Sequence, residues 1–288
     1  MVRSYVEVAE GWTRERAGGL GPFVTREELR RPDGTLVLWD SRRHRKHSRA
    51  TGPDPTWWAP GALGWWIGVL FALGSAGFAL GSFPPYTTSV GARTDSITYF
   101  VGSLFFTTAA FFQYVETVGS SHVLGGAPDR RWRRLLSAEP RRIDWWAAAV
   151  QLLGTLLFNR STFQAIVTAP APQSINHNVW RPDVYGSVCF LVASGLAWFE
   201  ACHGFGAWRP RSIPWWITAL NLAGSVAFGV SAAASFVEPD GSVRSLALTN
   251  LGTFVGALCF LAGSLLLLPE RTAGTPAGTG QRGALAAS

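Results

Sequence analysis

The chain contains little charge for its length. Of its 288 residues, 15% are charged and 48% are hydrophobic, whereas about a quarter of the residues in a soluble domain are charged. Lysine is almost absent, since Lys46 is the only one and the other basic residues are arginines. So few charged side chains leave too little polar surface for a soluble fold, and they favour a protein in contact with lipid.

Cysteine and known catalytic motifs are also scarce. Cys189, Cys202 and Cys259 lie in or at the end of apolar segments and form no CxxC pair, which predicts buried free thiols rather than a disulfide framework. No hydrolase elbow, P-loop or HExxH pattern occurs. We therefore predict a protein that is not an enzyme, with no catalytic residue, no metal and no cofactor. The first 20 residues hold six charged residues and no apolar run, which predicts that no ordinary signal peptide is cleaved.

Long apolar segments dominate the rest of the chain. Each is about as long as the 20 residues that a helix needs to cross a bilayer. They cover residues 61–83, 97–118, 145–166, 184–202, 215–237 and 246–268. Only helices and closed barrels satisfy the backbone in hydrocarbon, and these segments lack the strict alternation of barrel strands. We therefore predict an all-α membrane protein with six transmembrane helices and a small cytoplasmic N-terminal region.

Basic residues are distributed unevenly between the two faces that these six segments define. Twenty-one of the 25 Lys and Arg residues lie before the first segment, after the last one, or in the connections that follow the second and fourth. The other three connections hold only Arg93, Arg181 and Arg244. Because cytoplasmic loops carry the excess of basic residues, we predict that both termini are cytoplasmic.

This distribution divides the chain into three parts. Residues 1–56 form a basic cytoplasmic region, residues 57–270 form the transmembrane domain, and residues 271–288 form a tail of low complexity that we expect to be disordered. The sequence does not indicate an oligomeric state.

The apolar segments repeat one pattern of tryptophan, glycine and phenylalanine. Each odd-numbered segment begins with a tryptophan pair, expected at the membrane interface: Trp65 and Trp66, Trp145 and Trp146, Trp215 and Trp216. Each segment also carries a glycine with a phenylalanine one turn later: Gly74, Gly102, Gly154, Gly186, Gly224 and Gly256. Such glycines let helices approach closely. The pattern predicts three helical hairpins, at about 61–118, 143–203 and 213–270, around a rough threefold axis.

The same segments resemble the YrhK-like domain family of uncharacterised bacterial multi-pass membrane proteins. The resemblance lies in WWIGVLFALGSAGF with FVGSLFFTTAAFFQYVE, and in LNLAGSVAFGVSAAASFV with NLGTFVGALCFLAGSLLLLPE. The N-terminal RRPDGTLVLWDSRRHRK and the central IDWWAAAVQLLGTLLFNRSTF add to it. The resemblance implies a small module of the bacterial inner membrane and carries no catalytic or binding residue to this chain.

Three glutamates stand at equivalent positions, at the end of each even-numbered segment: Glu116, Glu200 and Glu270. They form either a convergent ring around a cation or proton path, or separate anchors at the headgroup level. As anchors they would pair with Arg141, Arg211 or the start of a neighbouring helix. Their position at the edge of the hydrocarbon favours dispersed anchors. Glu200 and His203 have the spacing of a metal-binding helix face, but no second carboxylate helix accompanies them.

Other polar residues lie deeper in the segments. Gln151 and Asn221 occupy equivalent positions, where hydrogen bonds between helices are the expected role. Asn159 and Arg160 lie towards the outer end of the third segment, where Arg160 either extends to the outer headgroups or binds an anion. We treat all of these residues as candidate positions for ion or solute contact.

The N-terminal region combines a folded motif with a basic run. TREELRRPDGTLVLWD predicts a short helix from a Thr25–Glu28 capping box, then a turn and a strand. Arg42, Arg43, Arg45 and Lys46 follow it, either as an ordinary basic flank or as a site for anionic lipid headgroups. The run lacks the aromatic residues of a nucleic-acid site. The sequence thus favours a structural, sensory or interaction role in the membrane, with a small-solute or ion transporter or channel as the alternative.

Overall fold

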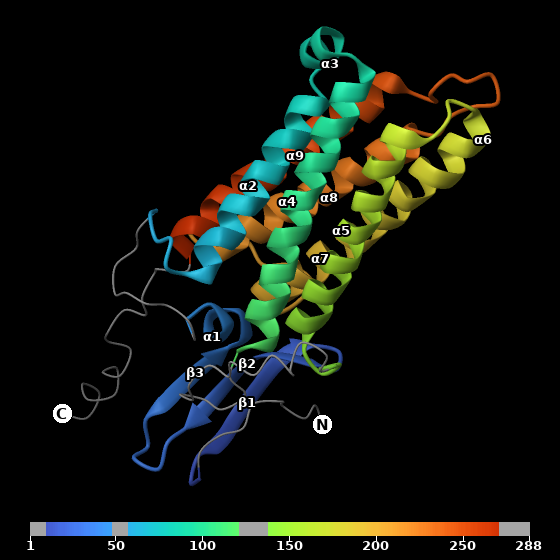
Figure 1. The fold of residues 1–288 in the computed structure, drawn as a ribbon. Coiled ribbons are helices and arrows are strands. Elements are labelled where there is room, and N and C mark those ends of the chain that lie inside the picture. The colour runs from blue at the N-terminus through green and yellow to red at the C-terminus, as the bar shows by residue number, and fades with distance from the viewer. Residues whose placement is uncertain (1–9, 48–56, 121–137, 271–288) are drawn as a thin grey trace.

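The computed structural model describes residues 10–47, 57–120 and 138–270, which form a small sheet and a long bundle of helices (Figure 1). The sheet is an antiparallel meander of β1 (Thr13–Leu20), β2 (Phe23–Arg30) and β3 (Leu36–Asp40). Helix α1 (Ser41–His47) follows directly and lies between the sheet and one end of the bundle. We call this end of the bundle the sheet end, and the opposite end the far end.

The sheet corrects one prediction, because residues 25–30 form part of β2 and not a short helix. In this strand Val24, Thr25, Glu27 and Leu29 are buried, so the alternation of a strand is present but is obscured by the buried Glu27. The predicted turn and the strand after it are confirmed. The Asp33 carboxylate accepts the Thr35 N–H at 2.8 Å, which is a local turn contact of Asp.

Six long helices form the bundle, and short helices connect some of them at the far end. The long helices are α2 (Leu63–Gly81), α4 (Ala92–Val118), α5 (Ile143–Val167), α7 (Arg181–Cys202), α8 (Ile213–Ala234) and α9 (Leu246–Glu270). The short ones are α3 (Pro84–Val90), α6 (Pro172–Ile175) and the π-helical turn η2 (Asn176–Trp180). Each long helix packs against the next, and α9 packs against α2, so the bundle is a closed ring.

Four helical stretches of the described chain are long and apolar enough to cross a membrane: Leu63–Gly81, Pro172–Cys202, Ile213–Ala234 and Leu246–Glu270. The structure is therefore mostly helical and consistent with a membrane protein, as predicted. Helices α4 and α5 have 27 and 25 residues but carry more polar side chains, among them Arg93, Asp95 and Arg160. The three cysteines are free, as expected, although only Cys202 is fully buried. The predicted disordered tail lies outside the described residues.

Glycines face one another where the paired helices α2 and α4, α5 and α7, and α8 and α9 meet. A Cβ atom added at Gly74 would lie 2.9 Å from the carbonyl oxygen of Gly102, and one at Gly154 would lie 3.2 Å from that of Gly186. At Gly256 it would lie 2.5 Å from a ring carbon of Phe228 and 3.0 Å from the carbonyl oxygen of Gly224. These helices therefore approach closely because their contact positions lack a side chain.

Six phenylalanine rings fill the middle of the bundle in two layers. The first layer comes from α2, α5 and α8, with ring centroids 5.8–6.2 Å apart: Phe78, Phe158 and Phe228. The second comes from α4, α7 and α9, with centroids also about 6 Å apart: Phe106, Phe190 and Phe260. Centroids of neighbouring rings in different layers lie 5.2–5.5 Å apart. The layers close the bundle axis with apolar, mostly edge-to-face contacts.

We expect Gly256→Ala to destabilise the protein by about 1–3 kcal/mol, because the new methyl group collides with Phe228 and with backbone. Gly195→Ala is the matched control, since Gly195 lies inside α7 with no atom of another residue near its Cβ position. That change is expected to stabilise the protein by about 0.5–1 kcal/mol through helix propensity. Thermal unfolding of the purified protein in detergent compares the two, and equal effects of the same sign would contradict the close approach.

Candidate functional site: buried ion pairs between helix α1 and the bundle

Each of the three repeated glutamates forms an ion pair with a base of α1 at the sheet end. Arg42 donates to both carboxylate oxygens of Glu270 at 2.8 and 3.1 Å. Arg45 donates to both carboxylate oxygens of Glu200 at 3.0 and 3.1 Å. Lys46 Nζ lies 2.7 Å from Glu116 Oε2. All six side chains are buried, so helix α1 is held by charge on α4, α7 and α9 at once.

This arrangement differs from both of the predicted ones. The carboxylates neither form an open ring nor anchor separately on Arg141 and Arg211, since these two arginines are exposed. All three carboxylates instead face the same short helix. Residues 42, 45 and 46 are spaced three and four apart, so they lie on one face of α1. One helical turn can thus supply a base to three bundle helices.

The start of α1 is fixed by Asp40, the last residue of β3. Its carboxylate accepts the backbone N–H of Arg43 at 2.9 Å, which is the contact of an N-cap residue with the third residue of the helix. Ser41, the first residue of α1, donates its hydroxyl to Glu200 at 2.7 Å. A seven-residue helix with four Arg and Lys side chains has little stability by itself. The cap and the bundle carboxylates therefore account for its formation.

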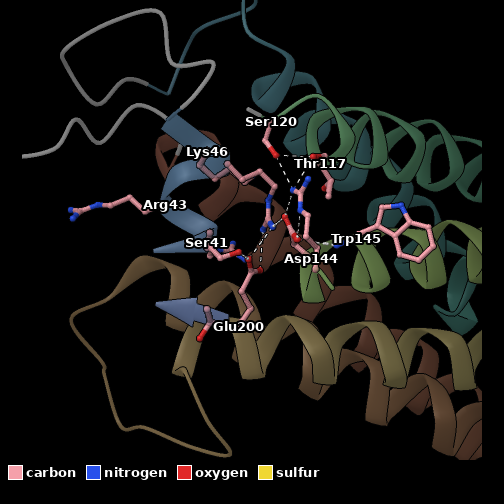
Figure 2. A network of polar contacts seen from close by, with 12 residues as sticks. Ser41, Arg43, Lys46, Thr117, Ser120, Asp144, Trp145 and Glu200 are labelled. Carbon is pink, nitrogen blue, oxygen red and sulfur yellow. Dashed lines mark hydrogen bonds and ion pairs between the residues drawn. The ribbon is translucent and has the colours of Figure 1, made fainter. Parts of the chain in front are cut away.

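A second group of buried charges lies beside Arg45 (Figure 2). The Arg45 guanidinium lies 2.9 Å from the carboxylate of Asp144 at the start of α5. The same carboxylate lies 2.6 Å from the guanidinium of Arg142. Arg142 donates further to the Thr117 carbonyl and to the Ser120 hydroxyl at the end of α4. Burial alone would lower the pKa of Arg45, but the carboxylates of Glu200 and Asp144 hold it well above its ordinary value.

His203 joins the sheet to the end of α7. One ring nitrogen lies 3.0 Å from Asp40 and the other lies 3.0 Å from the hydroxyl of Thr25 in β2. Glu200 and His203 thus have different partners and do not converge on a common point. Within residues 10–47, 57–120 and 138–270, no group of His, Cys, Asp and Glu side chains could hold a metal ion.

We expect Asp40→Asn to weaken the contact between the sheet and the bundle by about 1.5–3 kcal/mol at neutral pH, the range for hydrogen bonds to charged groups. Burial raises the pKa of Asp40, but hydrogen bonds from His203 and from the Arg43 N–H outweigh it, so the pKa lies below its ordinary value. A depressed carboxyl pKa contributes stability above the unfolded pKa of about 4 and loses it as the pH falls further. The stability difference between the wild type and Asp40→Asn should therefore shrink below about pH 4. A constant difference across a pH series of unfolding measurements would contradict this role of Asp40.

A polar chamber of about 50 Å³ lies between α1 and the phenylalanine layers. Its walls include the predicted Gln151 and Asn221, and also Gln113 of α4, which the sequence analysis did not single out. Arg42, Arg45 and Lys46 close it on the sheet side, and Phe106, Phe190 and Phe260 close it on the other. A polar space of this size holds a few water molecules.

The predicted tryptophan anchors lie at the sheet end of the bundle. Trp66, Trp146 and Trp216 each donate their indole N–H to the carbonyl of a proline six residues earlier, at 2.9–3.2 Å, while their rings are 39–43% exposed. Trp65 and Trp215 are buried and donate to the carbonyls of Trp57 and Ala207. Trp145 packs edge-on against Trp146. Partly exposed indole rings of this kind are typical of the interface between lipid and water, so the interfacial role stays a prediction.

The remaining predicted residues are not part of the ion-pair group. Arg160 is exposed on α5, and Asn159 beside it is half-buried. Among the four bases predicted for lipid headgroups, Arg43 is the exposed one, whereas the other three are buried against carboxylates.

Sequence reasoning missed Asp144, Arg142 and Ser41. Asp144 directly precedes a tryptophan pair at the start of an apolar segment. A carboxylate at that position indicates either helix capping or a buried ion pair.

The fold and this site define a helical protein consistent with membrane insertion, in which an N-terminal sheet and helix are docked on a closed bundle by buried ion pairs. No family model matches the chain, and no similar protein is found among curated proteins or solved structures. The resemblance to YrhK-like proteins therefore stays a prediction.

Proposed function

We propose that the chain is a six-span protein of the bacterial inner membrane with both termini in the cytoplasm. The length of α4 and α5 supports two further spans beside the four apolar ones. The exposed tryptophans and the docked basic helix share one end of the bundle, which supports a cytoplasmic sheet end. Reporter fusions at Ser288 and within residues 170–178 test this topology, and a cytoplasmic signal from the second fusion would overturn it.

We also propose that the six spans are three repeats of one hairpin, and that the hairpins resemble YrhK-like modules. Equivalent residues make equivalent contacts: facing glycines, two triangles of phenylalanines, tryptophans bonded to a preceding proline, and glutamates paired with α1. Superposition of α5 and α7 on α8 and α9 in an experimental structure tests the repeat.

The proposed role is non-enzymatic: the N-terminal sheet and α1 form a cytoplasmic sensing or interaction domain that docks on the membrane bundle. The three buried ion pairs between α1 and the glutamates carry this proposal. Breaking one of these pairs alone leaves a buried charge without its partner, which is unfavourable. The three pairs are therefore expected to form and break together, so that the domain is either docked or released. Release of the domain would then be a signal to, or from, the bundle.

Charge exchange at Lys46 and Glu116 tests the docking. In membrane vesicles with the cytoplasmic face outward, we expect a protease to spare the N-terminal domain of the wild type and to remove it from Lys46→Glu. Protection should return in the double variant Lys46→Glu/Glu116→Lys, and Arg43→Glu should behave like the wild type because Arg43 is exposed. Equal cleavage of all four proteins would overturn the proposal.

A closed pathway for ions or small solutes is a second candidate function. An open pocket of about 420 Å³ at the far end contains Asp95 and Asp183, and the polar chamber lies on the other side of the phenylalanine layers. Apolar constrictions of this kind gate channels by excluding water. If Lys46→Glu raises ion flux in proteoliposomes and the charge-exchanged double variant does not, the pathway is favoured over a purely sensory role.

A further inference from the structure

A second, open pocket of about 490 Å³ lies beside the ion-pair group at the sheet end. It is bounded by β3 and α1 on one side, and by the ends of α7 and α9 and the start of α8 on the other. Its charged lining residues are mostly basic: Arg42, Arg43, Lys46, His203, Arg209 and Arg211, with the carboxylates of Asp40 and Glu270.

The charges that face this pocket do not balance. Glu270 is paired with Arg42, and Asp40 with His203. Lys46 is paired with Glu116, outside the pocket. Arg209 and Arg211 are exposed, and neither forms an ion pair with any part of the chain that the structure describes. These two arginines leave a surplus of positive charge in the pocket.

The backbone adds to this positive potential. Helix α8 begins at Ile213 with Ser212 as its N-cap residue, and no side chain caps that end. Ser212, Ile213 and Pro214 all line the pocket. The start of a 22-residue helix carries partial positive charge and favours a bound anion. The pocket therefore combines guanidinium groups with a helix start, which suits a phosphate group.

Exposed aromatic residues show from which side such an anion arrives. The connection between α7 and α8 carries Phe205 and Trp208, each 78% exposed, and Trp216 in the first turn of α8 is 42% exposed. Large aromatic side chains at this exposure suit the interface between lipid and water, where their rings contact acyl chains and headgroups. Arg209 and Arg211 lie within the same short segment, so their guanidinium groups share that depth.

We propose that this pocket binds the phosphate-bearing headgroup of an anionic phospholipid from the cytoplasmic leaflet. Arg209 and Arg211 pair with the phosphate, and Phe205 and Trp208 lie among the neighbouring lipids. The inference rests on the proposed membrane orientation for the leaflet, but the pocket and its charge surplus are independent of it. The lipid contact is thus assigned to the start of α8. The buried bases of α1 are instead paired with the three glutamates of the bundle.

Titration of the full-length protein in detergent with phosphatidylglycerol, followed by native mass spectrometry, tests this site. Each base near an anionic surface contributes an energy equivalent to about fivefold in affinity, so Arg209→Gln/Arg211→Gln should bind the lipid about thirtyfold more weakly. The control Arg16→Gln/Arg141→Gln removes the same charge from exposed positions, and Arg141 is the repeat equivalent of Arg211. It should bind within about twofold of the wild type, given how little an exposed, distant charge contributes. An equal loss in both double variants would overturn the pocket as the site.

Two further measurements separate the alternatives. Phosphatidylcholine should bind more weakly than phosphatidylglycerol, and the Arg209→Gln/Arg211→Gln change should leave its binding unaltered. Inorganic phosphate alone should not compete, and competition at the affinity of the lipid would overturn the lipid assignment in favour of a free phosphate. Protease protection of the N-terminal domain is measured separately. A selective loss of lipid binding with normal docking therefore supports the pocket even if the proposed sensing role is wrong. The reporter fusions decide independently which leaflet supplies the lipid.

Discussion

Arg45→Met is expected to destabilise the docked state by about 3–5 kcal/mol, the usual loss when one partner of a buried ion pair is removed. Among the residues that the structure describes, the substitution leaves Glu200 with the Ser41 hydroxyl, and Asp144 with Arg142 as its remaining ion-pair partner. Thermal unfolding in detergent measures the loss, and it should be among the largest for any single change at the sheet end.

The matched double variant distinguishes charge from packing. Arg45→Met/Glu200→Met removes both members of the pair, and well-packed apolar replacements of buried ion pairs are often neutral. Most of the stability should therefore return. The control Arg43→Met changes an exposed arginine of the same helix and should shift stability by about 0.5 kcal/mol or less. If Arg45→Met and Arg43→Met have equal effects, the buried pairs do not hold α1 on the bundle.

Phe106→Ala is expected to cost about 3–5 kcal/mol, the range for truncating a buried aromatic residue. Phe106 is 6% exposed, and its ring contacts Phe71, Phe78, Phe190 and Phe260. It also faces the polar chamber, so the truncation enlarges the chamber towards the middle of the bundle.

The control for this change lies on the same helix. Phe111 is 43% exposed on α4, so Phe111→Ala should have little effect on stability. The two variants are compared by thermal unfolding, and the same proteins in proteoliposomes test the pathway. Increased ion flux through Phe106→Ala alone would favour the second candidate function, whereas equal stability loss at both positions would contradict a core role for Phe106.

The amino-acid sequence by itself predicted most of the architecture of this protein. Apolar segments of about 20 residues predict helices, because in hydrocarbon the backbone N–H and C=O groups must form hydrogen bonds within the segment. The four-residue spacing of Gly74 and Phe78 places them on one helix face, and the described helices meet where these glycines lie. The Pro32–Gly34 turn was also readable, since turn residues act through contacts with their own neighbours in the chain.

Local pattern was not enough where a side chain depends on a distant partner. The Thr25–Glu28 spacing favoured a helix, but pairing with β1 and β3 and burial of Leu29 and Trp39 in a common core made this segment a strand. Sheet contacts override a weak helix signal because they bury side chains and satisfy the backbone at the same time.

Only the tertiary structure decided the partners of Glu116, Glu200 and Glu270. Their equivalent positions at the ends of three segments were visible in the sequence, but 25 basic residues were available to pair with them. The sheet places α1 over the end of the bundle, and this position brings Arg42, Arg45 and Lys46 within 2.7–3.0 Å of the three carboxylates. The strength of an ion pair depends on burial and distance rather than on sequence spacing. For that reason the composition indicated a basic region near a membrane, whereas the fold determined that its charges are buried against carboxylates of the bundle.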